Sequence, residues 1–139
     1  MKYSISEILQ RAVAGDKVNG KAVLLQKYDN PTLRKILKYM FSDKVTFEGL
    51  PEGEPPYKPN DLVDVENVIY AETRRLYLFT DGGNANLKAT RKEALFIEVL
   101  EAVDKRDAKL LIAMKDKKMP EDLKGISKAV VKKAFPDLL

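Results

Sequence analysis

Two consecutive apolar segments between residues 90 and 118 constrain this chain most, because no other stretch can bury as much apolar surface. Thr90 and Glu93 have the spacing of a capping box, which predicts that a helix begins there. The apolar residues that follow recur at intervals of three and four, which predicts one buried face: Phe96, Val99, Leu100 and Val103. Four charged residues of the same predicted helix are expected to face solvent: Lys92, Glu93, Glu98 and Glu101.

The second segment follows Asp104, which we expect to end the first helix and to cap the next. This second helix is apolar over much of its circumference, so it should contact other elements on two sides. Asp107 in the first turn and lysines in the last turn suit the helix dipole. The short link predicts a helical hairpin around which the other helices pack.

Three helices are expected before residue 42. A capping box at Ser4 and Glu7 begins the first, and a lower-propensity second helix spans residues 18–28. The third begins at an Asn30-Pro31 cap and carries the clearest amphipathic pattern in the chain: Leu33, Ile36, Leu37, Met40 and Phe41.

The remaining helices are predicted on both sides of the hairpin. A long helix over residues 65–80 should turn four residues inward, namely Val65, Ile69, Leu76 and Phe79. Ser127 should cap a short last helix over residues 128–135. The sequence therefore predicts an all-α fold with one domain over residues 1–139: N-terminal helices in 1–42, a connector in 43–63 and a helical core in 64–139.

The connector contains four prolines between Leu50 and Pro59, which excludes a regular helix there. One interpretation is a proline-rich ligand for an aromatic groove in another protein. The other, which we favour, is an ordered connector held on the surface by Leu50 and Tyr57.

The chain contains neither cysteine nor histidine, which excludes Cys-His and Ser-His nucleophilic arrangements and the usual zinc and iron sites. We therefore expect no catalytic residue, no metal, no cofactor and no enzymatic activity. No apolar run approaches the roughly 18 residues of a membrane span, so a membrane partner is not expected either.

The net charge of +4 is unevenly distributed. Lys and Arg outnumber Asp and Glu by 9 to 4 in residues 1–45 and by 15 to 10 in residues 73–139, whereas acidic residues lead by 7 to 1 in residues 46–72. This segregation indicates either a nucleic-acid surface or an acidic middle that neutralises its neighbours within the fold. The candidate nucleic-acid-binding residues are Arg34, Lys35, Lys38, Arg74, Arg75, Lys115, Lys117, Lys118, Lys132 and Lys133.

Aromatic and terminal apolar residues are the candidates for binding a protein partner: Tyr57, Tyr70, Tyr77, Phe135, Leu138 and Leu139. The ending Ala134-Phe-Pro-Asp-Leu-Leu139 resembles in composition the tails that dock into sliding-clamp grooves. The alternative is that Phe135 and the two leucines pack back onto their own domain.

Three stretches resemble an uncharacterised family of small proteins from T4-like contractile-tailed bacteriophages, including those of cyanobacteria. They are Leu50-Pro-Glu-Gly-Glu-Pro-Pro-Tyr-Lys-Pro-Asn60, Arg75-Leu-Tyr-Leu-Phe-Thr-Asp-Gly-Gly-Asn84 and Asp107-Ala-Lys-Leu-Leu-Ile-Ala-Met-Lys-Asp-Lys-Lys118. The resemblance implies a phage protein in the cytoplasm of the infected bacterial host.

A second resemblance concerns the order of three short stretches: Asp104-Lys-Arg-Asp107, Gly125-Ile-Ser127 and Phe135-Pro-Asp-Leu-Leu139. This order is similar to that in the helical N-terminal DNA-binding domain of T4-like phage DNA ligases. The resemblance implies DNA binding without ligation.

Three functions follow as hypotheses. The first is a non-enzymatic accessory protein that binds a host or phage protein, with transcription or replication machinery as the natural target. The second is a DNA-binding protein that uses basic helix faces, and the third is a structural component of the virion.

Overall fold

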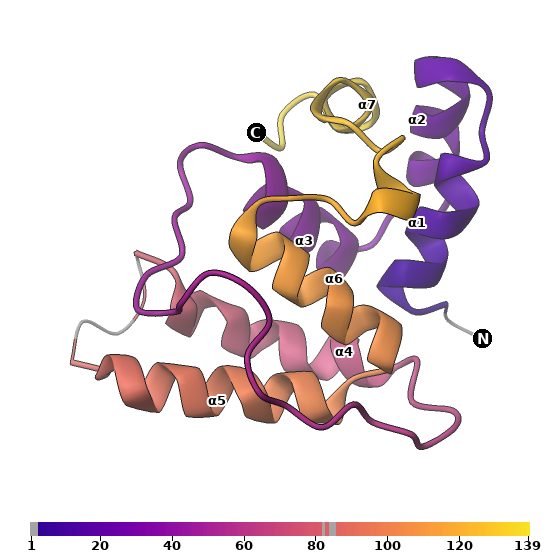
Figure 1. Ribbon diagram of the computed structural model, residues 1–139. Helices are drawn as coiled ribbons and strands as arrows, with labels where there is room; N and C mark the ends of the chain where they lie inside the picture. The colour runs from indigo at the N-terminus through magenta and orange to yellow at the C-terminus, as the bar shows by residue number, and fades with distance from the viewer. Residues whose placement is uncertain (1–2, 82, 84–85) are drawn as a thin grey trace.

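The predicted hairpin is formed by α5 (Ala89–Ala102) and α6 (Lys105–Asp116) in the computed structural model, which describes residues 3–81, 83 and 86–139 (Figure 1). The predicted stripe on α5 is buried, as is Val103 directly after the helix. The side chain of Asp104 accepts a hydrogen bond from the N–H of Arg106 and so caps α6. Helix α6 packs against α1, α3 and α5 and is therefore buried on several sides. This confirms the prediction that it contacts other elements on two sides.

The N-terminal helices are α1 (Ile5–Val13), α2 (Lys17–Lys27) and α3 (Pro31–Phe41), close to their predicted bounds. Ser4 Oγ accepts from Glu7 N–H at the start of α1, and Asn30 Oδ1 accepts from Leu33 N–H at the start of α3. The last helix, α7 (Lys128–Ala134), packs mainly against α2 and is capped by Ser127, as predicted.

The prediction of one long helix over residues 65–80 is wrong. The structure has a five-residue helix, α4 (Val68–Glu72), followed by the 3-10 helix η1 (Thr73–Phe79). At the point where the helix changes, the Thr73 hydroxyl and the Thr73 backbone N–H both donate to the carbonyl of Ile69. With three residues per turn, Thr73, Leu76 and Phe79 share the buried side of η1.

Three further details differ from the sequence analysis. Helix α5 starts at Ala89, and no side chain caps it, so Thr90 lies inside the first turn and the predicted capping box does not form. Lys92 is buried and not solvent-facing, because its Nζ extends to the carbonyl of Glu48, 3.4 Å away. Val65 precedes α4 and is only half-buried. The glycines after residue 80 also predict that residues 81–86 end the preceding helix, but Gly82, Asn84 and Ala85 lie outside the described residues.

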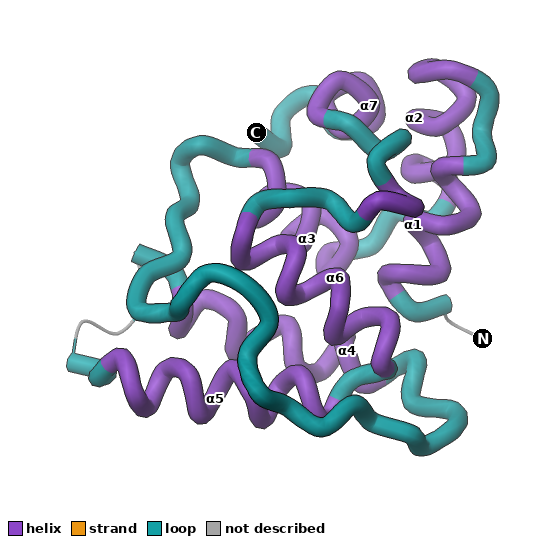
Figure 2. Tube along the Cα trace, in the orientation of Figure 1, coloured by secondary structure: helices purple, strands orange, loops and turns teal. Residues whose placement is uncertain are grey.

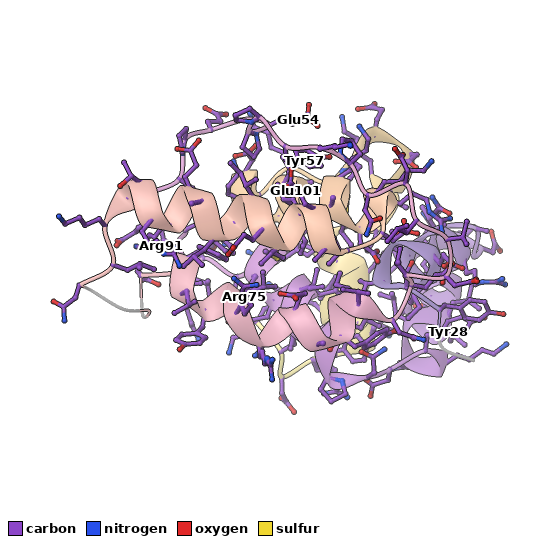
Figure 3. All side chains as sticks on the ribbon, turned by 90° about the horizontal axis from the view of Figure 1, so that it is seen from below. Tyr28, Glu54, Tyr57, Arg75, Arg91 and Glu101 are labelled. Carbon is purple, nitrogen blue, oxygen red and sulfur yellow. The ribbon has the colours of Figure 1, made fainter. Side chains whose placement is uncertain are left out.

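Residues 50–60, which we call the proline-rich strap, form an ordered connector (Figure 2). Lys58 N–H donates to Glu101 at 2.7 Å, and the Asn60 side chain donates to the carbonyl of Ala102 at 3.0 Å. Figure 3 shows Tyr57 on the strap where it passes over α5 beside Glu101. Leu50 and Tyr57 pack against the core of their own chain. This confirms the interpretation of the segment as a connector held on the surface by these two residues.

The C-terminal residues also pack back onto the fold. Phe135 is buried, and Leu138 and Leu139 lie against the core. The short helix η2 (Glu121–Leu123) connects α6 to this end of the chain. None of the helices in the described part of the chain is long and apolar enough to cross a membrane.

Candidate nucleic-acid interface

The outer side of α3 carries three basic residues. Burial of the opposite stripe turns Arg34, Lys35 and Lys38 toward solvent, and all three are exposed. Lys38 follows Lys35 by three residues and Arg34 by four, so it neighbours both on the outer surface of the helix. The amphipathic pattern of α3 therefore determines both the burial of its apolar side and the presentation of its cations.

Along one border of this helix surface lies a hollow of about 180 Å³ between α3 and η1. Lys35 on α3 and Arg74 on η1 both line it, so these two cations belong to one surface. The rest of the lining is uncharged: Pro31, Thr32, Tyr70 and Thr73. We call this feature the α3–η1 hollow.

Along the other border, α7 approaches α3. The Arg34 guanidinium lies over the Phe135 ring, 4.6 Å from its centroid, and Lys128 Nζ pairs with Asp43 at 3.3 Å. The end of α7 is thus close to the start of α3, and the start of α7 is close to the residues that follow α3. Lys132 and Lys133 are exposed one turn before Phe135.

We call these six residues the basic face: Arg34, Lys35, Lys38, Arg74, Lys132 and Lys133. Asp29 pairs with Arg34 through two contacts of 2.7 Å, and this hydrogen-bonded pair lowers the pKa of Asp29 and raises that of Arg34. The other five cations form no ion pair within the described part of the chain. Five long cationic side chains are therefore free to bind anions.

Four of the ten predicted nucleic-acid-binding residues do not belong to this surface. Lys115 is a correction: its side chain is 3% exposed, and its ammonium group binds the strap and Asp116. Lys117 donates to the carbonyls of Tyr39 and Ser42, and burial lowers its pKa. Arg75 pairs with two glutamates, and Lys118 pairs with one on the strap.

Most of the predicted partner-binding residues have intramolecular roles. Phe135, Leu138 and Leu139 pack against the core, so the structure supports the alternative in which the tail folds back. The Tyr70 hydroxyl donates to the carbonyl of Tyr3 at 2.6 Å. Among the six candidates Tyr77 has the most open position, at 50% exposure.

Sequence reasoning missed the two most exposed large apolar side chains of the described residues, Leu62 at 73% and Val63 at 82%. They lie between Asp61 and Asp64, in the loop between the strap and α4. The available signal is a pair of apolar residues flanked by two aspartates directly after the prolines. Both apolar residues fall within the connector predicted over residues 43–63, for which the sequence predicts no separate role.

The described residues contain no cluster of three or more carboxylates that could hold a metal ion. The basic face combines exposed cations with the uncharged lining of one hollow, so its chemistry suits a polyanion such as a phosphate backbone.

A family model described as "Family of unknown function (DUF6433)" matches residues 8–121. The match covers α1 to the start of η2 and ends before α7. Comparisons with curated proteins and with solved structures gave no match.

Proposed function

We propose that the protein, which belongs to DUF6433, a family of unknown function, is a non-enzymatic protein that binds nucleic acid through its basic face. The observation that carries this proposal is the continuity of that surface. Lys35 and Arg74 share one hollow, and Arg34 reaches the end of α7. Of the ten basic residues chosen from the sequence, three are exposed on α3, Arg74 lines the same hollow as one of them, and Lys132 and Lys133 are exposed near the end of α7 that Arg34 contacts.

The physical basis is electrostatic. Each Lys or Arg that neutralises a phosphate releases a condensed counterion, so binding weakens linearly on a logarithmic scale of salt concentration. Five unpaired cations on B-form DNA predict a slope of about −4 to −5. The chain offers few polar side chains among these cations, so we expect little discrimination between base sequences.

The test is a fluorescence-anisotropy titration of a short labelled DNA duplex at several salt concentrations. The Lys35→Ala/Lys38→Ala variant should bind more weakly, and its salt slope should be smaller by about two. Lys118→Ala is the matched control, because Lys118 is an exposed lysine beside Glu52 and outside the basic face. Equal loss in both variants, or no binding by the wild type at low salt, would overturn the proposal.

Protein binding, the first hypothesis from the sequence, is a second candidate function. The observation that favours it is the exposure of Leu62 and Val63, which nothing in the described chain covers. With the phage resemblance, the proposal places either activity in the cytoplasm of an infected bacterium. Detection of the protein in purified particles would instead favour the virion role.

A further inference from the structure

We propose that the chain binds a second copy of itself by placing Leu62 and Val63 in the α3–η1 hollow of that copy. We call residues 61–64, which include these two apolar side chains, the knob. The inference goes beyond nucleic-acid binding, and it uses a part of the basic face that includes Lys35 and Arg74.

The knob is an anchored turn that presents two aliphatic side chains. Asn60 Oδ1 accepts from Leu62 N–H at 2.9 Å, while the Asn60 amide donates to the carbonyl of Ala102 at the end of α5. Asp64 completes the turn with a φ of 59°, a conformation that aspartate tolerates better than most residues. Because this backbone is held in place, less conformational entropy is lost when the side chains bind.

The hollow has a lining that suits an aliphatic side chain. Pro31, Thr32 and Thr73 contribute apolar carbons to its wall, together with the ring of Tyr70. Lys35 and Arg74 are placed at the same hollow and are exposed to solvent. An aliphatic side chain inside it would lose contact with water while the two cations stayed hydrated at the edge.

Charge favours this pairing over other occupants. Asp61 and Asp64 flank the aliphatic pair, and residues 60–66 contain no Lys or Arg. Three cations lie around the knob: Lys105 and Arg106 line the same hollow as residues 60–64, and Lys58 lines another hollow with Asp61 and Leu62. Arg106 is paired with Asp104 and Glu7. The two hollows beside the knob are lined by five carboxylates and three cations, so the surroundings of the apolar projection carry an excess of negative charge. The α3–η1 hollow has cations and no carboxylate in its lining, so the two surfaces of the same chain are complementary in charge.

This contact joins two different surfaces. In a dimer with one such contact, one copy therefore retains an unused knob and the other an unused hollow, unless a second, symmetry-related contact joins these as well. It is also small, which predicts association at high micromolar to millimolar concentration. Because Lys35 and Arg74 belong to the basic face, bound nucleic acid should compete with the second copy.

The test is sedimentation velocity of the full chain without nucleic acid, at low salt and at concentrations up to about 1 mM. The knob variant is Leu62→Ser/Val63→Ser, and the hollow variant is Lys35→Glu/Arg74→Glu. All four residues are exposed, so both variants should fold, and circular dichroism checks this. Val23→Ser, which changes another exposed apolar residue at 61% exposure on α2, is the control.

We expect concentration-dependent association of the wild type and of Val23→Ser, with the dissociation constant raised at least about tenfold in either double variant. An equimolar mixture of the two double variants should form a one-to-one complex, because one supplies an intact hollow and the other an intact knob. A monomeric wild type, unchanged association of either variant or no complex in the mixture would each overturn the inference. DNA binding by a wild type that stays monomeric would leave the proposed function intact and reject this inference alone.

Discussion

Asp107 Oδ1 on α6 accepts a hydrogen bond of 2.9 Å from the backbone N–H of Ser6 in the first turn of α1. This contact joins residues that are 101 positions apart and satisfies a donor that the start of α1 leaves unpaired. Asp107 is fully buried, and its Oδ2 has no hydrogen-bond partner in the described structure. Burial therefore raises the pKa of Asp107 to about 6, although the contacts with Ser6 oppose the shift.

The first prediction is a fall in stability as pH rises from about 4 to 6. Since the folded-state pKa of Asp107 is above its ordinary value, the folded state holds the proton more tightly, and stability is lost as that proton leaves. The loss amounts to at most about 3 kcal/mol. In Asp107→Asn this contribution should vanish, so the difference in unfolding free energy between wild type and variant should change across this range and stay constant above it. Urea unfolding at a series of pH values measures it, and a constant difference contradicts the account.

The second prediction concerns the attachment of the proline-rich strap. Lys115 Nζ donates to the carbonyls of Pro51 and Gly53 at 2.9 and 3.1 Å, and it pairs with Asp116 at 2.6 Å. Lys115→Met should therefore lower the free energy of unfolding by about 1 to 3 kcal/mol, because it leaves two carbonyls of the strap without their charged donor and the Asp116 carboxylate without its cation. Protease cleavage within residues 50–60 should become faster.

Lys118→Met is the matched control for the strap. Both side chains of its ion pair with Glu52 are exposed, so its loss should change stability much less than the loss of Lys115. Equal unfolding free energies and cleavage rates in the two variants would mean that Lys115 does not hold the strap.

The third prediction compares two glycines at the corner between α1 and α2. A Cβ at Gly15 would be 2.8 Å from backbone atoms of Gly20 and Lys21, so Gly15→Ala should destabilise the fold by more than about 1 kcal/mol. Gly20 lies inside α2, and its nearest neighbours would be at an ordinary 3.5 Å. Gly20→Ala should therefore stabilise by up to about 1 kcal/mol. Thermal unfolding of both variants gives the sign of each change in stability. Two stability changes of the same sign would disprove this description of the corner.

The fourth prediction tests the packing of the central hairpin. Leu111 on α6 is fully buried, so Leu111→Ala should cost about 3 to 5 kcal/mol in unfolding free energy. Leu62→Ala removes the same atoms from an exposed position and should change it by less than about 0.5 kcal/mol. Chemical unfolding at a low protein concentration measures both, and comparable losses would show that α6 is not central.

The hairpin and α3 could be predicted because their apolar spacing acts locally, and Asp104 and Asn30 cap α6 and α3 where the sequence indicates. The start of α5 could not, since no side chain caps it. The 3-10 helix η1 could not, because its geometry depends on Thr73 bonding to Ile69 and on packing against α3 and α5. Intrinsic propensity is a weak prior where tertiary contacts decide the outcome.

The site was predictable only in part for a related reason. Composition and helix period identified Arg34, Lys35 and Lys38 as exposed cations, but nothing in the sequence places Arg74 beside Lys35. The same charge count includes Lys115, whose burial depends on a strap more than 50 residues away. Charge can therefore be counted from the sequence, whereas the surface it occupies depends on the fold.

The proposed nucleic-acid function is tested most directly by an NMR titration of the ¹⁵N-labelled chain with a short DNA duplex at low salt. The account predicts amide shift changes concentrated at residues 31–38, 74 and 132–133, fading as salt is added. Shift changes centred on α5 and the proline-rich strap, or none at any duplex concentration, would contradict it.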